Sequence, residues 1–167
     1  ASRDLGGYFR LLKNKSYLRY GLSHALVLGG LLIFVFSLPV VIIETMGGTI
    51  GNFIYIQVCG VASFIIMSNL AGNMVKRYGA EFAITAGTAL ALFGALVILL
   101  YALLGGNDPL MLIPAFIPMN VGLGLRGGAG FMKALEAARH DDARGSALII
   151  LGVMVFASLG TAILAPF

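Results

Sequence analysis

Five long apolar runs separated by short polar connectors dominate the pattern along the chain. At about 1.5 Å per residue, each run would reach roughly 30 Å or more as a helix, enough to cross the hydrocarbon core of a bilayer. Backbone polar groups in lipid must be paired within their own segment, so we interpret each run as a transmembrane helix. The runs cover residues 18–43, 52–75, 80–104, 109–130 and 145–165.

Composition supports this interpretation and excludes several classes of protein. Of the 167 residues, 59% are hydrophobic and 11% are charged, whereas soluble domains carry about a quarter charged residues. A chain of this length cannot bury so much apolar surface in a core of its own. The sequence therefore predicts an all-α integral membrane protein whose main partner is the lipid bilayer. Cys59 is the single cysteine, which excludes a disulfide within the chain and a metal site built from cysteines.

The positive charges predict an orientation in the membrane. All eleven Lys and Arg residues lie before or at the start of the first run, between the second and third runs, or around the connector between the fourth and fifth. The connectors "ETMGGTIG" and "GGND" contain none. The cationic side is expected to be cytoplasmic, which puts the N-terminus inside. The net charge is +4, but the cations are scattered between apolar runs, so we expect no nucleic-acid partner.

Residues 1–17 are predicted to form a basic cytoplasmic segment ahead of the first crossing. The stretch "YFRLLKNKSYLRYG" alternates aromatic and aliphatic residues with cations. Such a mixture is typical of a segment that lies on the inner leaflet of a membrane. An ordinary polar linker is the alternative. Residues 18–167 would then form the transmembrane bundle.

Three polar residues inside the runs are candidates for lining a substrate cavity. His24 titrates near physiological pH and is a candidate proton carrier, with a hydrogen bond to a neighbouring helix as the alternative. The same two alternatives, cavity lining or helix pairing, apply to Gln57. Asn120 follows Pro114 and Pro118, both of which we expect to kink the fourth helix. Interrupted helices at bilayer depth often border a transport cavity, although the two prolines also fit a plain kink.

Charged and small residues near the ends of the runs suggest further roles. Glu44 follows Pro39, a third expected helix kink, and is a candidate gate at the external mouth, with simple solvation as the alternative. Arg126 is expected near the inner end of the fourth helix. Its head would either extend to lipid headgroups or meet an anionic group in the bundle. Gly124 and Gly128 are four residues apart, a spacing that predicts close packing of helices in lipid.

Residue groups typical of soluble enzymes are missing from the sequence of the five runs. They contain no His/Cys cluster and no paired carboxylates, and "GLGLRGG" is not followed by the G-K-[ST] of a phosphate-binding loop. The stretch "HDDAR" offers His140, Asp141 and Asp142 as metal ligands, but we interpret it as a solvated loop. We therefore expect no enzymatic activity, no cofactor and no metal.

The stretch "GNMVKRYG" resembles a signature of the major facilitator superfamily, G-x-L-A-D-R-x-G-R-R/K. The signature forms the cytoplasmic turn between helices two and three, and a weaker copy recurs between helices eight and nine. Gly72, Arg77 and Gly79 match it, while Lys76 replaces the Asp. That departure is usual in the second copy and argues against a lock based on Asp. The resemblance implies that these four residues form a cytoplasmic turn involved in conformational change.

Two further stretches resemble bacterial drug:proton antiporters of the bicyclomycin-resistance type. The stretch "YFRLLKNKSYLRYGLSHALVLGGLLIFVFSLPVVI" resembles the start of their helix seven. The stretch "ALEAARHDDARGSALIILGVM" resembles their connection from helix ten to helix eleven. By this resemblance the five runs correspond to helices seven to eleven and form most of one six-helix bundle. Its partners would be an N-terminal six-helix half and a twelfth helix, both absent from this sequence.

The resemblance implies transport by alternating access around a central cavity. We expect proton-coupled efflux of small drug-like molecules across a bacterial inner membrane. His24, Asn120 and Arg126 would line the cavity, and a carboxylate of the N-terminal half would carry the proton. Two alternatives are a stand-alone five-helix structural or regulatory subunit and a major-facilitator transporter for metabolite uptake.

Overall fold

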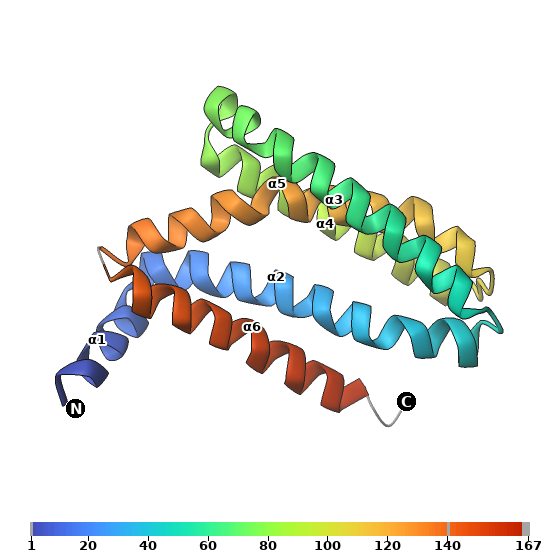
Figure 1. The fold of residues 1–167 in the computed structure, drawn as a ribbon, viewed down its shortest axis with the longest axis horizontal. Coiled ribbons are helices and arrows are strands. Elements are labelled where there is room, and N and C mark those ends of the chain that lie inside the picture. Colours follow the sequence, from blue (N-terminus) through green and yellow to red (C-terminus); the bar gives the residue numbers. More distant parts are fainter. Residues whose placement is uncertain (1, 140, 165–167) are drawn as a thin grey trace. The chain divides into compact units, whose positions relative to one another are not determined.

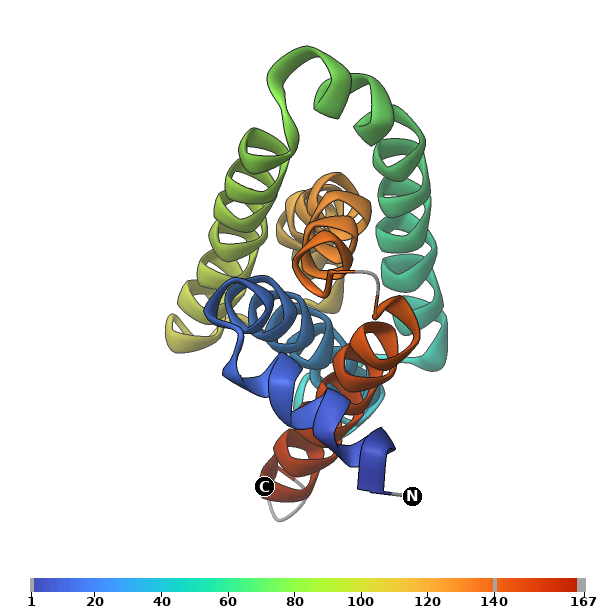
Figure 2. The same ribbon diagram turned by 90° about the vertical axis from the view of Figure 1, so that its left-hand side faces the viewer.

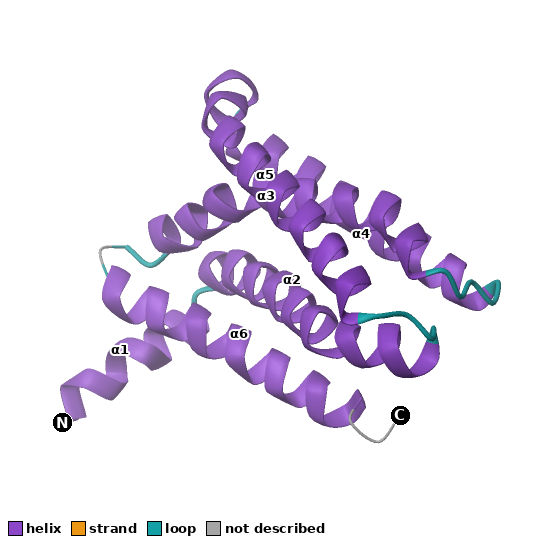
Figure 3. Cartoon of the chain, turned by 45° about the vertical axis from the view of Figure 1, so that its right-hand side comes forward, coloured by secondary structure: helices purple, strands orange, loops and turns teal. Residues whose placement is uncertain are grey.

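The computed structural model describes residues 2–139 and 141–164, and this part of the chain consists of helices and connecting loops without a strand (Figure 3). Among the described residues, five helical stretches are long and apolar enough to cross a membrane. The chain is therefore an integral, multi-pass membrane protein. In order, the elements are α1 (Ser2–Lys13), α2 (Lys15–Val40), a π-helical turn (Val41–Thr45), α3 (Ile50–Tyr78), α4 (Ala80–Leu103), a 3-10 turn (Pro109–Leu112), α5 (Ile113–Ala137) and α6 (Asp142–Leu164) (Figure 1).

The helices are divided between two compact units. The first unit contains the chain up to Phe34 together with the chain from Ala129 onward, and the second unit is Val35–Gly128. The first unit therefore contains α1, most of α2, the end of α5 and α6. The second contains the π-helical turn, α3, α4 and the first two thirds of α5.

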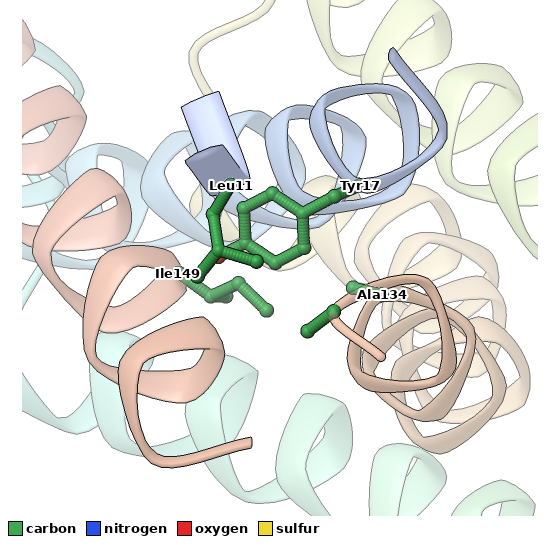
Figure 4. Close-up of a cluster of buried hydrophobic side chains, with 5 residues drawn as sticks. Leu11, Tyr17, Ala134 and Ile149 are labelled. Atoms are coloured by element: carbon green, nitrogen blue, oxygen red, sulfur yellow. The ribbon is translucent and has the colours of Figure 1, made fainter. Parts of the chain in front are cut away.

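A small buried core fastens α1 to the other helices of the first unit. Each of four helices contributes a side chain to this core (Figure 4): Leu11 from α1, Tyr17 from α2, Ala134 from α5 and Ile149 from α6. The Tyr17 hydroxyl donates a hydrogen bond of 2.6 Å to the carbonyl oxygen of Gly145. This core lies at the end of the unit where α1 and α2 meet, so it sets the position of the basic N-terminal helix.

Small residues bring α2 and α6 together farther along the first unit. A Cβ atom on Gly29 would lie 3.4 Å from the carbonyl oxygen of Val153, and one on Gly152 would lie 3.2 Å from the Cβ of Ala25. Burial of large side chains gives little stabilisation between helices in lipid, because the surrounding acyl chains are equally apolar. Close backbone approach through small residues replaces it as the source of packing energy.

The second unit is built around α5, which passes between α3 and α4 (Figure 2). One face of α5 approaches α4 at Gly122, where a Cβ atom would lie 2.6 Å from the backbone nitrogen of Ala91. The other face approaches α3 at Gly124, where a Cβ atom would lie 2.7 Å from the carbonyl oxygen of Phe64. These contacts make α5 the central helix of this unit.

Two connectors of the second unit lie at the same end. A Cβ atom on Gly48, in the connector before α3, would lie 2.7 Å from Pro109 at the start of the 3-10 turn. Thr49 and Asn52 form a capping box at the start of α3, which satisfies two backbone N–H groups that the helix leaves free. These are the connectors "ETMGGTIG" and "GGND", which the sequence predicts to share one side of the membrane.

Large apolar side chains point outward on the spanning helices, as expected for a protein whose solvent is lipid. Ile66 of α3, Phe93 of α4 and Leu151 of α6 are all exposed. In water these side chains would form apolar patches far larger than soluble proteins tolerate. In a bilayer the same surface faces acyl chains.

The observed helices differ from the predicted runs mainly at their ends. The fourth run, predicted to end at residue 130, continues as α5 to Ala137. The charged stretch that follows Gly130 is helical because Ala134 and Ala138 pack into the buried core of the first unit. At the other end of the chain, α1 stops at Lys13 and α2 begins at Lys15, so part of the predicted basic segment belongs to the first spanning helix.

Two of the three prolines that were expected to kink a helix lie inside one. Pro39 lies in α2 and is followed directly by the π-helical turn. Proline has no N–H to donate, and a local π-turn is a common way to accommodate the lost bond. Pro118 lies inside α5. Pro114 is the second residue of α5, where the missing N–H costs nothing, so its expected role as a mid-helix kink is wrong.

Candidate functional site

The most unusual feature of the second unit is the burial of two polar side chains of α5. Asn120 is 5% exposed and Arg126 is 2% exposed, although both lie in a span that is otherwise apolar. Arg126 is among the largest fully buried side chains of the described residues. Polar groups at this depth are costly, so their retention in a span usually indicates a function.

Asn120 lies at the contact between α5 and α3. A Cβ atom on Gly60 of α3 would lie 3.0 Å from the Asn120 Nδ2 atom and closer still to the ring of Phe116. Glycine at position 60 therefore makes room for both side chains. The Nδ2 atom donates a hydrogen bond of 2.9 Å to the carbonyl oxygen of Phe116, one turn earlier on α5. This bond fixes the amide orientation and leaves the carbonyl oxygen of Asn120 as an acceptor.

Gln57 lies one turn before Gly60 on the same helix. Its Oε1 atom is buried and accepts no hydrogen bond from residues 6–139 or 141–164. A buried acceptor without a donor loses the free energy of hydration without compensation. Gln57 is therefore a place where a ligand with an N–H or O–H group would be stabilised.

The backbone nitrogen and the Cβ atom of Arg126 lie against α4. A Cβ atom on Gly87 would lie 2.8 Å from the Cβ of Arg126. Because α5 continues to Ala137, Arg126 lies about 16 Å along the axis from the end of the helix. The helix therefore continues farther beyond Arg126 than the sequence predicted, and the position of Arg126 near the inner membrane face stays a prediction. The buried guanidinium does not extend along the surface toward headgroups.

His24 belongs to the first unit, whereas Gln57, Asn120 and Arg126 belong to the second. The His24 side chain is 6% exposed. Its ring lies 5.5 Å from the ring of Phe131, centroid to centroid, with an interplanar angle of 53°. This tilted contact joins α2 to the end of α5 within the first unit. The imidazole is thus held in a defined position, as both of its predicted roles require.

The signature-like stretch ends α3 and forms its turn into α4. Lys76 and Arg77 are exposed in the last turn of α3, and the Arg77 guanidinium lies 5.2 Å from the ring centroid of Tyr78. Gly79 has φ of +88° and ψ of 161°, a conformation that is essentially restricted to glycine. Gly72 lies in α3 with open space around it. Cations at a helix C-terminus also interact favourably with the helix dipole.

The remaining predicted site residues are at the surface or outside the described part of the chain. Glu44 lies in the π-helical turn and is exposed. His140 lies outside the described residues. Within residues 6–139 and 141–164, no group of three or more His, Cys, Asp and Glu side chains is arranged to hold a metal ion. Asp141 instead binds Arg10 and Arg144.

Sequence reasoning missed the glycines that build this site. Gly60 and Gly87 are the positions of α3 and α4 where α5 fits most closely around Asn120 and Arg126. The spacing of Gly87, Ala91 and Gly94 along α4 is a small-residue pattern that could have indicated this face. By contrast, Gly128 has nothing within 4 Å of the position of a Cβ atom, so only Gly124 of the predicted pair makes a close contact.

Comparison of the chain with protein-family models, with curated proteins and with solved structures finds no match. The chemistry of the site therefore has to be judged from its own residues. The Asn120 amide, the buried Oε1 atom of Gln57 and the buried guanidinium of Arg126 can orient a polar group or counter a negative charge. These residues form no arrangement of nucleophile and base.

Proposed function

We propose that this chain is part of a secondary active transporter of the major facilitator type. The observation that supports this proposal most is the burial of Asn120 and Arg126 in α5, the central helix of its unit. Helices of a purely structural bundle gain nothing from an arginine in an apolar span, whereas transporters use such residues on substrate and ion pathways. The resemblance of Gly72–Gly79 to the cytoplasmic turn of that superfamily supports the same proposal.

In this proposal the transporter exports small drug-like molecules in exchange for protons across a bacterial inner membrane. Asn120 and Gln57 orient the polar group of an otherwise apolar substrate. Arg126 provides a fixed positive charge in a medium of low dielectric constant. Such a charge favours the ionised form of any carboxylate that approaches it. A proton-carrying carboxylate in the other half would then release its proton more readily in the state that brings it near Arg126.

The first test is the mass of the native polypeptide in its own membrane. An antibody against residues 133–139 would be used on an immunoblot of that membrane. The chain of 167 residues has a mass of 17.5 kDa, and the proposal requires a band of at least about twice that mass, as two six-helix bundles need. A native band at 17.5 kDa would instead support the five-helix subunit.

The second test measures ethidium efflux from energised cells that produce the whole native protein. We expect efflux that stops when a protonophore collapses the proton gradient. Asn120→Ala should reduce the initial efflux rate by about tenfold or more, since it removes an oriented polar contact worth over 1 kcal/mol. Asn69→Ala is the matched control, because Asn69 makes the same bond to the carbonyl oxygen four residues earlier but is exposed.

Equal effects of these two substitutions, at equal amounts of protein in the membrane, would contradict the role of Asn120. His24→Gln and Arg126→Gln complete the series. If neither variant changes the efflux rate or its dependence on pH, the roles assigned to both residues are wrong. Absence of any efflux driven by protons from the whole protein would overturn the transport direction and the coupling ion together.

A further inference from the structure

A basic pocket lies in the first unit, whereas the buried polar residues of α5 belong to the second. Its volume is 540 Å³, which is within the range of small-ligand sites, about 300–1,000 Å³. The described lining residues include three cations and no carboxylate. They come from the end of α1, the α1–α2 turn and the end of α5: Arg10, Leu11, Lys13, Asn14, Ala138 and Arg139.

The floor and the sides of the pocket are held by tertiary contacts. Leu11 and Ala138 are buried in the core of the first unit. Asn14 bridges the two sides, because its Nδ2 atom donates a 2.8 Å hydrogen bond to the carbonyl oxygen of Ala137. Its Oδ1 atom accepts hydrogen bonds from the backbone N–H groups of Ser16 and Tyr17 at the start of α2. The pocket is therefore part of the fold and needs no ligand to form.

Arg139 reaches the pocket from a strained backbone position. It is the one described residue other than glycine with a positive φ, at +52°. Helices commonly end at such a position with glycine, and other residues pay a conformational cost there. An arginine at this position lowers the stability of the turn. That cost is explained if the guanidinium has a ligand to bind.

The cations around the pocket are only partly neutralised. Asp141 is 12% exposed at its side chain and binds both Arg10, at 3.2 Å, and Arg144, at 3.1 Å. Lys13 and Arg139 form no ion pair with residues 6–139 or 141–164. Of the other nearby carboxylates, Glu136 binds Lys133 and Asp142 is exposed in the first turn of α6. The pocket thus keeps a net positive charge.

Exposed apolar side chains lie next to these cations on α1. Phe9 is 64% exposed and Leu12 is also exposed, and they directly precede Arg10 and Lys13 in the sequence. A soluble phosphate would use only the cations. A phospholipid would use both, with its phosphate among the basic side chains and its acyl chains against Phe9 and Leu12.

We propose that this pocket binds the phosphate group of an anionic phospholipid. The proposal does not depend on the transport function, since it concerns residues that take no part in the substrate path described above. It agrees with the predicted cytoplasmic location of the N-terminus, because anionic lipids attract basic segments at that membrane surface. The α1 helix would then be anchored by specific lipid binding as well as by general charge attraction.

The experiment uses fluorescence quenching by brominated lipids in nanodiscs. The chain contains no Trp, so the Phe9→Trp variant has a single reporter beside the pocket. Phosphatidylglycerol and phosphatidylcholine, each with brominated acyl chains, are compared at equal mole fractions in a phosphatidylcholine background. We expect severalfold stronger association with phosphatidylglycerol.

Two pairs of substitutions with the same loss of charge distinguish a pocket from general attraction. Lys13→Gln with Arg139→Gln should abolish most of the severalfold preference, so that phosphatidylglycerol and phosphatidylcholine associate almost equally. Lys15→Gln with Arg19→Gln removes two exposed cations of the same unit that do not line the pocket. This control should change the preference much less. Equal losses in the two pairs would overturn the proposal.

Arg139→Gly separates binding from folding. Glycine accepts the positive φ without strain, so this variant should raise Tm while lowering the preference for phosphatidylglycerol. A higher Tm with unchanged preference would contradict the role of Arg139. Titration with inorganic phosphate in lipid-free detergent tests whether the pocket binds free phosphate instead of a phospholipid headgroup. Saturable phosphate binding without a lipid preference would overturn the assignment to a phospholipid.

Discussion

Gly87 of α4 and Gly122 of α5 are in backbone contact: a Cβ atom on Gly87 would lie 2.5 Å from the carbonyl oxygen of Gly122. Neither position has space for a methyl group. The contact holds α4 against the same helix that carries Asn120 and Arg126, so the position of the candidate site depends on two residues that have no side chains. This relationship makes specific predictions about stability.

Replacement of Gly122 by Ala should destabilise the second unit. The added methyl group would lie 2.6 Å from the backbone nitrogen of Ala91, and relief of such overlap typically costs about 1–3 kcal/mol. The measurement is Tm in mild detergent. Gly128→Ala on the same helix is the control, because nothing lies within 4 Å of its added methyl group. It should leave Tm unchanged or raise it through better helix propensity. If Tm falls equally in the Gly122→Ala and Gly128→Ala variants, overlap between α4 and α5 is not the cause of the destabilisation.

Gly79→Ala should destabilise the turn between α3 and α4. The backbone at Gly79, with φ of +88° and ψ of 161°, is strained for any residue with a Cβ atom, at a cost on the order of 1–3 kcal/mol. Gly72→Ala is the comparison within the same stretch, since Gly72 is helical and has open space around it. Unfolding in increasing concentrations of sodium dodecyl sulfate would show the difference. If Gly79→Ala and the unmodified protein unfold at the same midpoint concentration of sodium dodecyl sulfate, the prediction of backbone strain is wrong.

Tyr17→Phe should weaken the core that fastens α1. The substitution removes the 2.6 Å hydrogen bond that the Tyr17 hydroxyl donates to the Gly145 carbonyl oxygen. Loss of this bond should lower the free energy of unfolding by about 1 kcal/mol. Tyr55→Phe is the control, because Tyr55 is exposed. Limited proteolysis near Lys13 should become faster in the first variant alone. Equal cleavage rates in the unmodified protein and the Tyr17→Phe variant would show that the bond does not hold α1 in place.

Membrane orientation can be tested with single cysteines in a Cys59→Ala background. Ala143, in the first turn of α6, and Asn107, in the connector after α4, are both exposed. The charge distribution assigns them to opposite sides of the membrane. In intact cells, an impermeant maleimide should label the Asn107→Cys variant at once. It should label the Ala143→Cys variant only after permeabilisation. The reverse pattern would mean that the N-terminus is outside.

The number and approximate limits of the spanning helices could be predicted from the sequence. Each apolar run is long enough to cross a bilayer, and lipid forces its backbone to pair within the run, so local composition decides the element. The ends could not be predicted in the same way. The fourth helix continues through "FMKALEA" because Ala134 packs against Leu11 and Tyr17, and residues so distant in sequence cannot be paired from composition.

The candidate site, too, could be predicted from the sequence only in part. Its polar members, Gln57, Asn120 and Arg126, stand out in the sequence because polar groups are rare in apolar runs. The sides of α5 on which Asn120 and Arg126 lie, and the glycines that make room for them, become visible only when α3 and α4 are packed on either side of that helix. The basic pocket is a similar case, since the end of α1 and the end of α5 are far apart in the sequence.

By itself the sequence determined that this chain crosses a membrane as helices, because hydrophobicity and the backbone's need for hydrogen bonds act within each segment. Tertiary structure decided which glycines allow helices to touch and how deeply Arg126 is buried. It also decided which cations surround a pocket. Those properties depend on contacts between distant segments, and packing between helices in lipid rests on local fit between surfaces rather than on hydrophobicity.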